Sequence, residues 1–350
     1  MFQGMKRVLV VATSRQTRGG ITAVVNAHSK GVQWSKYHIK WIGAYVDRSN
    51  WMKILIFLTS LCHYLVVLPF YDLVHIHVST HVSVFRKSFY LYPAKWLGKK
   101  VIIHLHCSTP SIIETHKRLY RNAFLASDLI LVLSSQWKEF IKNTLGISER
   151  VIVLYNPIIS LPQVGKHYGK KKYILFAGTV DKRKGYHDLI ASFSMVSMLF
   201  PDWRLLIAGN GEVEEGKSLA KRLGIDAKVE FLGWITGDTK DTVFGEASIY
   251  CLPSYAEGFP MSVLDAWAYG LPVVCTPVGG IMDVAKDGEN IMLFNPGNIK
   301  MLSEKLSLLM GNACLRESIA LHSRTLSDTI FNLNRINSQL GDLYKQLLGE

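Results

Sequence analysis

The segment that most constrains the fold of this chain runs from Tyr250 to Gly280 and reads YCLPSYAEGFPMSVLDAWAYGLPVVCTPVGG. An apolar run (247–252) ends in a loop, a helix is predicted over 261–269, and a second strand follows over 271–275. A strand, a loop, a helix and a strand in this order are typical of a parallel crossover unit. The segment therefore predicts an α/β fold built on parallel sheets.

The loop of this segment carries the first candidate functional residues. Glu257 lies in the loop, and Asp265 lies in the second turn of the predicted helix. Pro260 is predicted at the first helical position, where its missing N–H would be unpaired anyway. Four backbone N–H groups should then point out of the helix N-terminus, those of Gly258, Phe259, Met261 and Ser262. An anion site between two carboxylates suits a phosphorylated sugar, because N–H groups bind phosphate oxygens and carboxylates accept from hydroxyls.

The same segment resembles the signature of the retaining family 4 glycosyltransferases (glycosyl transferases group 1), which have the GT-B fold. That signature places two Glu residues within a run like E-G-F-P-x-x-x-L-E-A-x-A-x-G-x-P-V-V. The matching residues here are Glu257, Gly258, Phe259, Pro260, Leu264, Asp265, Ala266, Ala268, Gly270, Pro272, Val273 and Val274. Asp265 replaces the second Glu, which keeps the charge and shortens the reach by one methylene. The alternative is an ordinary crossover with a solvated Glu257.

A basic loop follows the predicted strand 173–178. Lys184 and Gly185 match the Lys-Gly of the family pattern, and Thr179 stands where the family has an Arg. Arg183 is therefore predicted to supply the missing charge, so that Arg183 and Lys184 neutralise a pyrophosphate. The alternative is a solvated basic turn.

Further positions are assigned through the resemblance alone. It implies backbone contacts to the donor nucleotide at Gly178, Thr179, Gly209, Gly233 and Trp234. It also implies that Gly19 and Gly20, which follow the first strand (8–12), lie under the donor phosphates, although a plain turn explains this dipeptide equally well. Backbone contacts do not reveal which base is bound.

Four histidines lie near the ends of two strands predicted over 72–77 and 100–106. Ligands gather at the carboxyl ends of parallel strands, so His77 and His106 are predicted to point into an interdomain cleft. His106 resembles the family's strand-end His that lines the sugar and acceptor site, whereas His75 and His104 are interpreted as structural. No metal is predicted, since no carboxylate or Cys has a tight spacing to these residues.

Charge is distributed unevenly along the chain. Residues 1–100 hold 14 Lys/Arg and 2 Asp/Glu, and residues 101–350 hold 26 and 25. Such a field attracts phospholipid headgroups, a lipid pyrophosphate or nucleic acid, unless it serves general solubility. The apolar run 54–68 is shorter than the ~20 residues of a membrane span. It predicts a core helix or, given Trp51, Lys53 and Phe57, a helix lying on anionic lipid.

The predicted architecture is α/β of the GT-B type, with two doubly wound Rossmann-like domains facing a cleft. Residues 5–156 form the acceptor-binding domain, 157–171 a linker, 172–325 the nucleotide-sugar-binding domain, and 326–350 a helix crossing back to the first domain. Five cysteines at isolated positions indicate a reduced, cytoplasmic setting.

The resemblance implies a retaining hexosyltransferase that uses a UDP- or GDP-type nucleotide sugar, without a metal or other cofactor. Glu257, His106, Lys184 and Arg183 are the implied catalytic residues, and Asp265 is expected to bind the ribose. The acceptor is expected to be a glycan or a lipid-linked molecule of cell-envelope polysaccharide or lipopolysaccharide synthesis, reached by peripheral contact with the inner membrane face. Nucleic acid is not an expected partner.

Two alternatives remain at this point. Another GT-B enzyme, a nucleotide-sugar epimerase or a phosphorylase, would release an epimer or a free sugar instead of a glycoside. A non-catalytic basic binding protein would bind no nucleotide sugar. A nicotinamide-dependent dehydrogenase is disfavoured, because no G-x-G-x-x-G follows the first strand.

Overall fold

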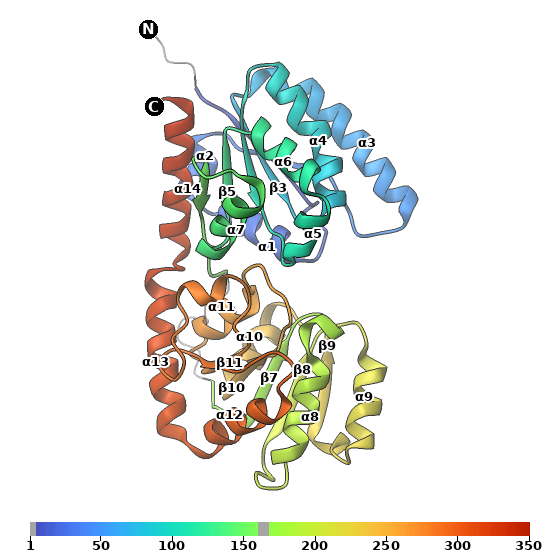
Figure 1. Cartoon of the computed structure of the whole chain (residues 1–350), viewed down its shortest axis with the longest axis vertical. Coiled ribbons are helices and arrows are strands. Elements are labelled where there is room, and N and C mark those ends of the chain that lie inside the picture. The colour runs from blue at the N-terminus through green and yellow to red at the C-terminus, as the bar shows by residue number, and fades with distance from the viewer. Residues whose placement is uncertain (1–4, 160–167) are drawn as a thin grey trace. The chain divides into compact units, whose positions relative to one another are not determined.

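The computed structural model describes residues 5–159 and 168–350, which fold into two compact units (Figure 1). Unit 1 comprises the described residues up to Ile159 together with Asn332–Glu350, and unit 2 extends to Phe331. Residues 160–167 of the predicted linker lie outside the described residues. Each unit contains a six-stranded parallel sheet with helices packed on it, so the α/β prediction is confirmed.

The sheet of unit 1 has the strand order β2-β1-β3-β4-β5-β6. Its strands are almost continuously buried, as expected for a parallel sheet covered on both faces. The strands are β1 (Val8–Ala12), β2 (Lys40–Gly43), β3 (Leu73–Val78), β4 (Lys100–Leu105), β5 (Leu129–Val132) and β6 (Val151–Val153). The helices are α1 (Gly20–His28), α2 (Val32–Lys36), α3 (Asn50–Val67), α4 (His81–Trp96), α5 (Pro110–Thr115), α6 (Lys117–Ala126), α7 (Ser135–Leu145) and α14 (Leu333–Leu348).

Side chains alternate along each strand of unit 1 and so build two cores. Leu9 and Val11 pack with residues of α3 and α4, including Tyr64. Val8 and Val10 belong to the opposite core with Tyr344 of α14. The C-terminal helix α14 is thus part of the packing of unit 1, although it follows unit 2 in the sequence.

The sheet of unit 2 has the order β12-β11-β10-β7-β8-β9. The chain adds β8 and β9 on one side of β7, and β10, β11 and β12 on the other, so the sheet order reverses between β7 and β10. Ligands of open α/β sheets bind at such switch points. The strands are β7 (Tyr173–Ala177), β8 (Arg204–Ala208), β9 (Val229–Gly233), β10 (Ile249–Leu252), β11 (Val273–Cys275) and β12 (Met292–Leu293). The helices are α8 (Tyr186–Val196), α9 (Val213–Arg222), α10 (Gly237–Glu246), α11 (Met261–Ala268), α12 (Ile299–Gly311) and α13 (Ala313–Thr329).

Three elements differ from the sequence prediction. The residues 37–44 alone predict one strand, but the strand is only β2, because the short helix α2 precedes it and Tyr37 ends that helix. The residues 315–347 alone predict one continuous helix, but the structure has two, and the Asn332 side chain caps the second by accepting from the N–H of Asn334. Helix α10 was not predicted, because its apolar residues are not concentrated on one side of the helix and so give no helical pattern.

The interpretation of 54–68 as a core helix is wrong for most of its surface. Helix α3 spans 18 residues, and Tyr64 is its one fully buried side chain. Its inner face packs on unit 1 through Phe57, Leu61 and Val67, whereas Trp51 and Ile54 are about two-thirds exposed, at 64% and 60%. Among the described residues, one helical stretch is long and apolar enough to cross a membrane. It covers Asn50–Phe70 and has a mean hydropathy of 1.8.

Candidate active site

Two loops meet at the switch point of unit 2. The loop after β7 makes a short 3-10 turn, Lys182–Lys184, which Asp181 caps by accepting from the Lys184 N–H at 2.8 Å. Gly185 then adopts φ 70°, and a Cβ there would lie 2.1 Å from the carbonyl oxygen of Pro253. Only glycine therefore allows this loop to approach the loop after β10 so closely. The Tyr255 N–H donates to the Arg183 carbonyl at 2.7 Å and holds the two loops together.

The close approach of the loops creates a buried ion pair. Lys184 Nζ lies 2.5 Å from Glu257 Oε1, and the Ser254 hydroxyl donates to the same oxygen at 2.6 Å. The side chains of Lys184 and Glu257 are 14% and 8% exposed. Arg183 is a further cation of this loop, and its Nη1 donates to the Ala256 carbonyl at 3.0 Å. Removing one partner of such a pair leaves an uncompensated buried charge, which costs about 3–5 kcal/mol.

The turn after β11 supports the Glu257 loop from behind. Gly279 adopts φ 67°, and a Cβ there would lie 2.5 Å from the Glu257 carbonyl oxygen. The Gly280 N–H donates to the Gly258 carbonyl at 2.7 Å, and the Thr276 hydroxyl donates to the Ser254 carbonyl at 2.5 Å. The turn 277–280, with the sequence Pro-Val-Gly-Gly, thus fixes the backbone conformation of the Glu257 loop.

Helix α11 begins at the end of this loop. Pro260 has ψ 108° and is the residue before the helix, so its predicted place at the first helical position is wrong by one residue. Met261 and Ser262 occupy the first turn, where backbone N–H groups have no acceptor within the helix. The ring of Phe259 is buried and packs 5.2 Å from the ring of Phe331. The helix start therefore offers N–H groups beside Glu257, as expected for an anion site.

Asp265, on α11, is paired with a residue that the sequence did not single out. Lys240 Nζ of α10 lies 2.6 Å from Asp265 Oδ2, and both side chains are largely buried. Tyr250 lies close to both carboxylates of the site. Burial above all, and then the negative charges of Glu257 and Asp265, hold the pKa of Tyr250 well above its ordinary value.

Several other residues that were predicted to contact the donor nucleotide lie at the carboxyl edge of the same sheet. The Gly178 N–H donates to the Ala208 carbonyl at 2.9 Å, and a Cβ on Gly209 would lie 1.8 Å from the Gly178 carbonyl oxygen. The Thr179 carbonyl accepts from the Asp181 N–H, which places it in the same loop as Arg183 and Lys184. Gly233 ends β9, and the following Trp234 is 44% exposed.

Three predicted site residues belong to unit 1. Gly19 precedes α1, and Gly20 is its first residue. His106 follows β4 and is partly buried, with Nε2 2.9 Å from Nδ1 of His77. His77 was predicted to open into a cleft, but it is 1% exposed, because it lies inside β3.

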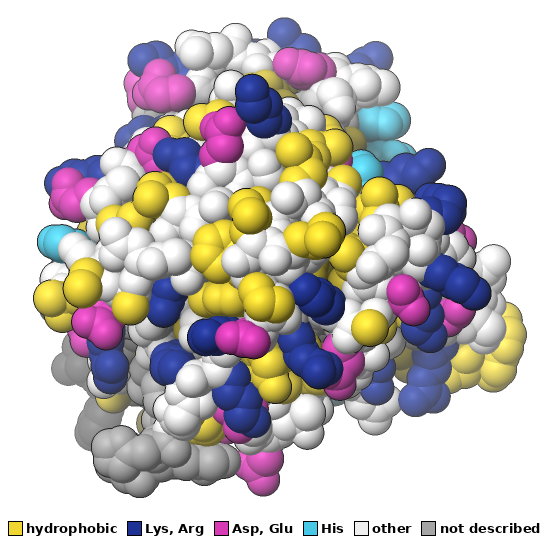
Figure 2. Space-filling model, turned by 90° about the horizontal axis from the view of Figure 1, so that it is seen from below, with side chains coloured by type: hydrophobic (Ala, Val, Ile, Leu, Met, Phe, Trp, Pro, Cys, Tyr) yellow, Lys and Arg dark blue, Asp and Glu magenta, His cyan; other side chains and the backbone are white. Residues whose placement is uncertain are grey.

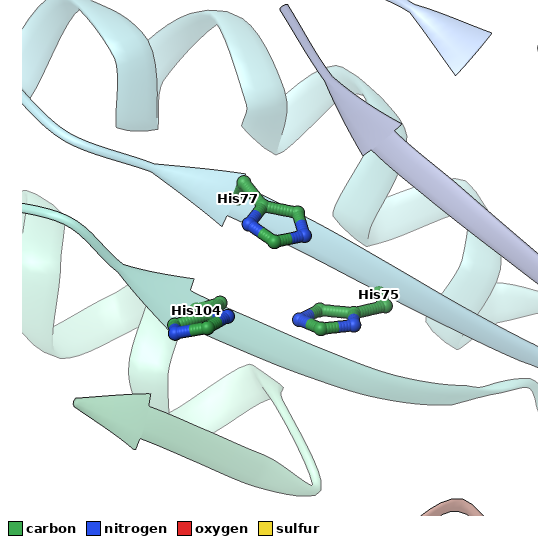
Figure 3. A group of neighbouring side chains, drawn as sticks. All are labelled: His75, His77 and His104. Carbon is green, nitrogen blue, oxygen red and sulfur yellow. The ribbon is translucent and has the colours of Figure 1, made fainter. Parts of the chain in front are cut away.

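His106 borders a cluster of buried imidazoles, of which Figure 3 shows His75, His77 and His104. His75 and His77 share one face of β3, and His104 is the register partner of His77 on β4. His75 Nδ1 lies 2.7 Å from the Tyr344 hydroxyl, whereas both ring nitrogens of His104 have no partner in the part of the chain that the structure describes. Burial lowers the pKa of each of the three well below its ordinary range, so the cluster is neutral at pH 7.

The cluster does not have the arrangement of a metal centre. Ligand nitrogens of His75, His77 and His104 lie within 4.8 Å of one another. However, the rings of His75 and His77 are inclined by 21°, and those of His75 and His104 by 15°. Histidines bind metals through lone pairs in the plane of the ring, and rings stacked with near-parallel planes do not direct these at one point. The absence of a metal stays a prediction.

Sequence reasoning missed two residues of the site. Ser254 precedes Glu257 by three positions, and it donates to the same Glu257 oxygen as Lys184 does. A single Ser in a loop gives no sequence signal of such a contact. Lys240 lies on the helix α10 that was itself not predicted. The carboxylate of Asp265 within a largely apolar helical segment is the one sequence signal that a cation should lie nearby.

Comparison with known proteins identifies the class to which this site belongs. The family profile of glycosyl transferases group 1 matches residues 158–325. An uncharacterized glycosyltransferase of Haemophilus influenzae is 35% identical over 253 residues, which cover 68% of this chain and 69% of that protein. This chain therefore belongs to the glycosyl transferases group 1 family and is a glycosyltransferase.

More distant relatives extend the likeness to the whole fold. A phosphatidyl-myo-inositol mannosyltransferase of Mycobacterium leprae is 26% identical over 71% of this chain and 66% of that protein. The crystal structure of Anabaena Alr3699/HepE in complex with UDP-glucose has a TM-score of 0.78 at 18% identity, over 97% of this chain and 99% of that chain. The GT-B fold class predicted from the sequence is confirmed.

Proposed function

We propose that this glycosyltransferase moves a hexose from a nucleoside-diphosphate sugar to its acceptor with retention of the anomeric configuration. The observation that carries the proposal is the ion pair between Lys184 and Glu257 at the switch point, beside the start of α11. The pair and the helix start place a cation, a carboxylate and backbone N–H groups beside one another. A cation and N–H groups bind a diphosphate, and a carboxylate accepts from sugar hydroxyls. The structures of Anabaena HepE with UDP and UDP-glucose support a UDP-type donor.

In the proposed reaction the donor separates the ion pair. Lys184 and Arg183 bind the diphosphate, and the α11 N–H groups take further phosphate oxygens. Glu257 accepts hydrogen bonds from hydroxyls of the donor sugar and fixes its pose, while Asp265 accepts from the ribose. As the bond from C1 to the phosphate oxygen breaks, two cations and a helix N-terminus stabilise the departing charge. These protein groups supply the positive charge without a metal or another cofactor.

Retention follows in the proposal from attack on the face that the diphosphate leaves. The acceptor oxygen forms its bond to C1 there, and the leaving phosphate oxygen takes the acceptor proton. Glu257 is the carboxylate assigned to the donor sugar, and the Ser254 hydroxyl donates to one of its oxygens, so we assign it to binding and not to covalent attack. His106 is assigned to orienting the sugar or the acceptor.

We infer that the acceptor is a glycan or a lipid-linked molecule of cell-envelope polysaccharide synthesis, met at the cytoplasmic face of the membrane. Unit 1 contains 22 Lys/Arg and 8 Asp/Glu, whereas unit 2 contains 18 and 19. A positive unit suits an anionic acceptor or lipid headgroup. All five cysteines are free thiols, which suits a reducing compartment.

The proposal is tested with purified full-length protein. A thermal-shift screen of UDP- and GDP-sugars identifies the donor as the nucleotide sugar that raises the unfolding temperature most. Transfer to a lipid-linked or glycan acceptor is then followed with that donor in the presence of EDTA, and the anomeric configuration of the product is read from its proton coupling constants. An inverted product, an epimerised donor or no stabilising nucleotide sugar would overturn the proposal.

A further inference from the structure

Unit 1 presents an apolar surface that its own core does not use. The outer side of α3 exposes Trp51, Ile54, Leu55, Leu58, Leu65 and Val66, each between 45% and 70%. The opposite side of this helix packs on unit 1 through Phe57, Leu61 and Tyr64, and the Tyr64 hydroxyl donates to the Tyr90 carbonyl at 2.6 Å. An exposed side chain of this size is ordinary when it stands alone, but a row of six along one helix is not.

Helix α4 carries a second exposed row. Its members recur at spacings of three or four residues, so they lie along one side of the helix. They are Val82, Phe85, Phe89, Tyr92 and Trp96, and Trp96 reaches 81% exposure. Residues between them, such as Tyr90 and Leu91, are buried in the core, so the row is the outward face of a well-packed helix.

The two rows form one continuous surface, which we call the α3–α4 face. The ring of Phe57 in α3 lies 5.7 Å from the ring of Phe89 in α4, and Phe89 in turn lies 5.7 Å from Phe85. Lys99 Nζ, just after α4, donates to the Pro69 carbonyl at 2.9 Å and ties the far ends together. Figure 1 shows the two helices side by side on one side of unit 1.

The surface is concentrated in one part of the described chain. Thirteen large apolar side chains that are exposed fall between Trp51 and Leu97. Unit 2 has eight among its described residues, and they are spread from Met195 to Leu321 over several helices and loops. The difference therefore does not reflect a general excess of surface apolar residues.

The charge that the two helices themselves carry is of one sign, and Asp47 and Asp128 at the edge of the face pair with Lys53, Lys95 and Lys100. Neither α3 nor α4 contains an Asp or a Glu, and residues 48–100 hold seven Lys/Arg and one Asp/Glu. Arg48 and Lys100, at the two ends of this segment, are exposed. Lys87 of α4 does not contribute to this charge, because it is 2% exposed and donates to the His77 carbonyl inside unit 1. Aromatic and aliphatic side chains with a cationic rim match the boundary of an anionic lipid bilayer.

We propose that the α3–α4 face docks unit 1 onto an anionic lipid bilayer, with its apolar side chains in the headgroup and acyl boundary and its cations on lipid phosphates. The helices lie along the surface and do not cross the membrane. Helix α3 connects β2 and β3 of one sheet, and Ser60 and Tyr64 bond to Tyr90 inside unit 1. A spanning α3 would break these contacts and expose the core beneath it. The inference deepens the proposed function, because it specifies how the enzyme reaches a lipid-linked acceptor.

Vesicle flotation of the full-length chain tests the proposal. We expect binding to protein-free vesicles of phosphatidylglycerol and phosphatidylcholine, weaker binding to phosphatidylcholine alone, and a decrease at high salt. The variant Leu58→Glu/Phe85→Glu places two carboxylates in the face at sites that are 51% and 60% exposed. It should lower the vesicle partition coefficient by at least about tenfold, since two immersed apolar side chains are lost and two anions are added.

The matched control is Met198→Glu/Leu199→Glu in unit 2, at sites that are 89% and 73% exposed. It adds the same charge elsewhere and should leave flotation unchanged. Equal binding of both variants, or no binding of the wild type to protein-free vesicles, would overturn the proposal. So would a wild-type dimer that Leu58→Glu/Phe85→Glu dissociates while vesicle binding stays the same, because the face would then join two copies. The assay contains no donor or acceptor, so a failure of the proposed transfer reaction does not change its outcome.

Discussion

The two units share one architecture and differ in what stands at the ends of their strands. In unit 2 the switch point carries ion pairs, Lys184 with Glu257 and Lys240 with Asp265. In unit 1 the ends of β3 and β4 carry neutral, stacked histidines, and the excess positive charge lies elsewhere on the unit. A sheet edge of the same kind thus holds charge in one unit and uncharged polar groups in the other.

This difference explains why the family resemblance is strong in unit 2 and weak in unit 1. A diphosphate imposes a fixed demand for cations and N–H groups, so the residues that meet it fall into a recognisable pattern. Neutral imidazoles, and a surface for a lipid or glycan acceptor, impose no comparable spacing. Figure 2 shows a face of the molecule on which cationic and anionic side chains are interspersed. In α3 and α4 of unit 1, by contrast, every charged side chain is a Lys or an Arg.

The largest effect should come from the carboxylate of the unit 2 site. Glu257→Gln keeps the size of the side chain and removes the charge that pairs with Lys184. If Glu257 fixes the sugar in its reactive pose, kcat should fall by roughly 10²–10³-fold, the loss typical of one preorganised polar group. Initial rates of glycoside formation at saturating donor measure it.

Glu304→Gln serves as the control for that change, because Glu304 is exposed on α12. Its kcat should equal that of the wild type. A Glu257→Gln enzyme with full turnover would show that the switch point of unit 2 is not where bond cleavage occurs, and the contrast between the units would lose its functional meaning.

The cation of the pair should have the next largest effect. Lys184→Ala should weaken the binding of UDP or GDP by roughly 10- to 100-fold, because a hydrogen bond to a charged group contributes about 1.5–3 kcal/mol. Isothermal titration calorimetry measures it, and circular dichroism checks that the variant is folded. Lys182→Ala, two positions away in the same turn and exposed, should bind as the wild type does. Equal affinities for both variants would contradict the role of Lys184.

Acid should destabilise unit 1 at a higher pH than unit 2. Burial lowers the pKa of His28 to about 4, and burial with the nearby Lys87 lowers that of His106 to about 3. Their ordinary value is 6.5, so the unfolded chain binds protons first as the pH falls. Stability that is complete above pH 6.5 is then lost towards pH 4, by up to about 1.4 kcal/mol per pH unit for each such His. Hydrogen exchange, corrected for intrinsic rates, should show unit 1 losing protection before unit 2.

The variant His104→Phe sharpens this test. Both nitrogens of His104 lack a partner among the described residues, so the ring can be replaced without losing a hydrogen bond that the structure shows. We expect the stability at pH 7 to stay within about 1 kcal/mol of the wild type and the acid sensitivity of unit 1 to decrease. An unchanged loss of protection at pH 5 would mean that the buried cluster does not drive the acid response.

Sequence reasoning reached the parts of the site that chain-local patterns encode. Glu257, Lys184 and Gly185 lie in loops that follow predicted strands, and the structure brings the two loops together at the point where the sheet order reverses. It did not reach Ser254 or Lys240, because their contacts depend on how separate segments pack. It left α3 with two interpretations, a core helix or a helix on lipid, because an apolar run predicts burial whether a protein core or another partner covers it.

The smallest effect should come from Asp265, one of the residues at which this chain departs from the family pattern. Asp265→Glu restores the longer side chain, and Lys240, 2.6 Å from Asp265 and on a flexible stem, should adjust to it. We expect the KM for the donor to change by less than about threefold, whereas Asp265→Ala should raise it by roughly tenfold through the loss of one hydrogen bond to the ribose. Calorimetry with the 2′,3′-dideoxy form of the nucleoside diphosphate identifies that contact. Removing the hydroxyls should weaken binding to the wild type and leave binding to Asp265→Ala unchanged. An equal loss in both proteins would place the ribose away from Asp265 and leave Lys240 as a partner that only neutralises a buried carboxylate.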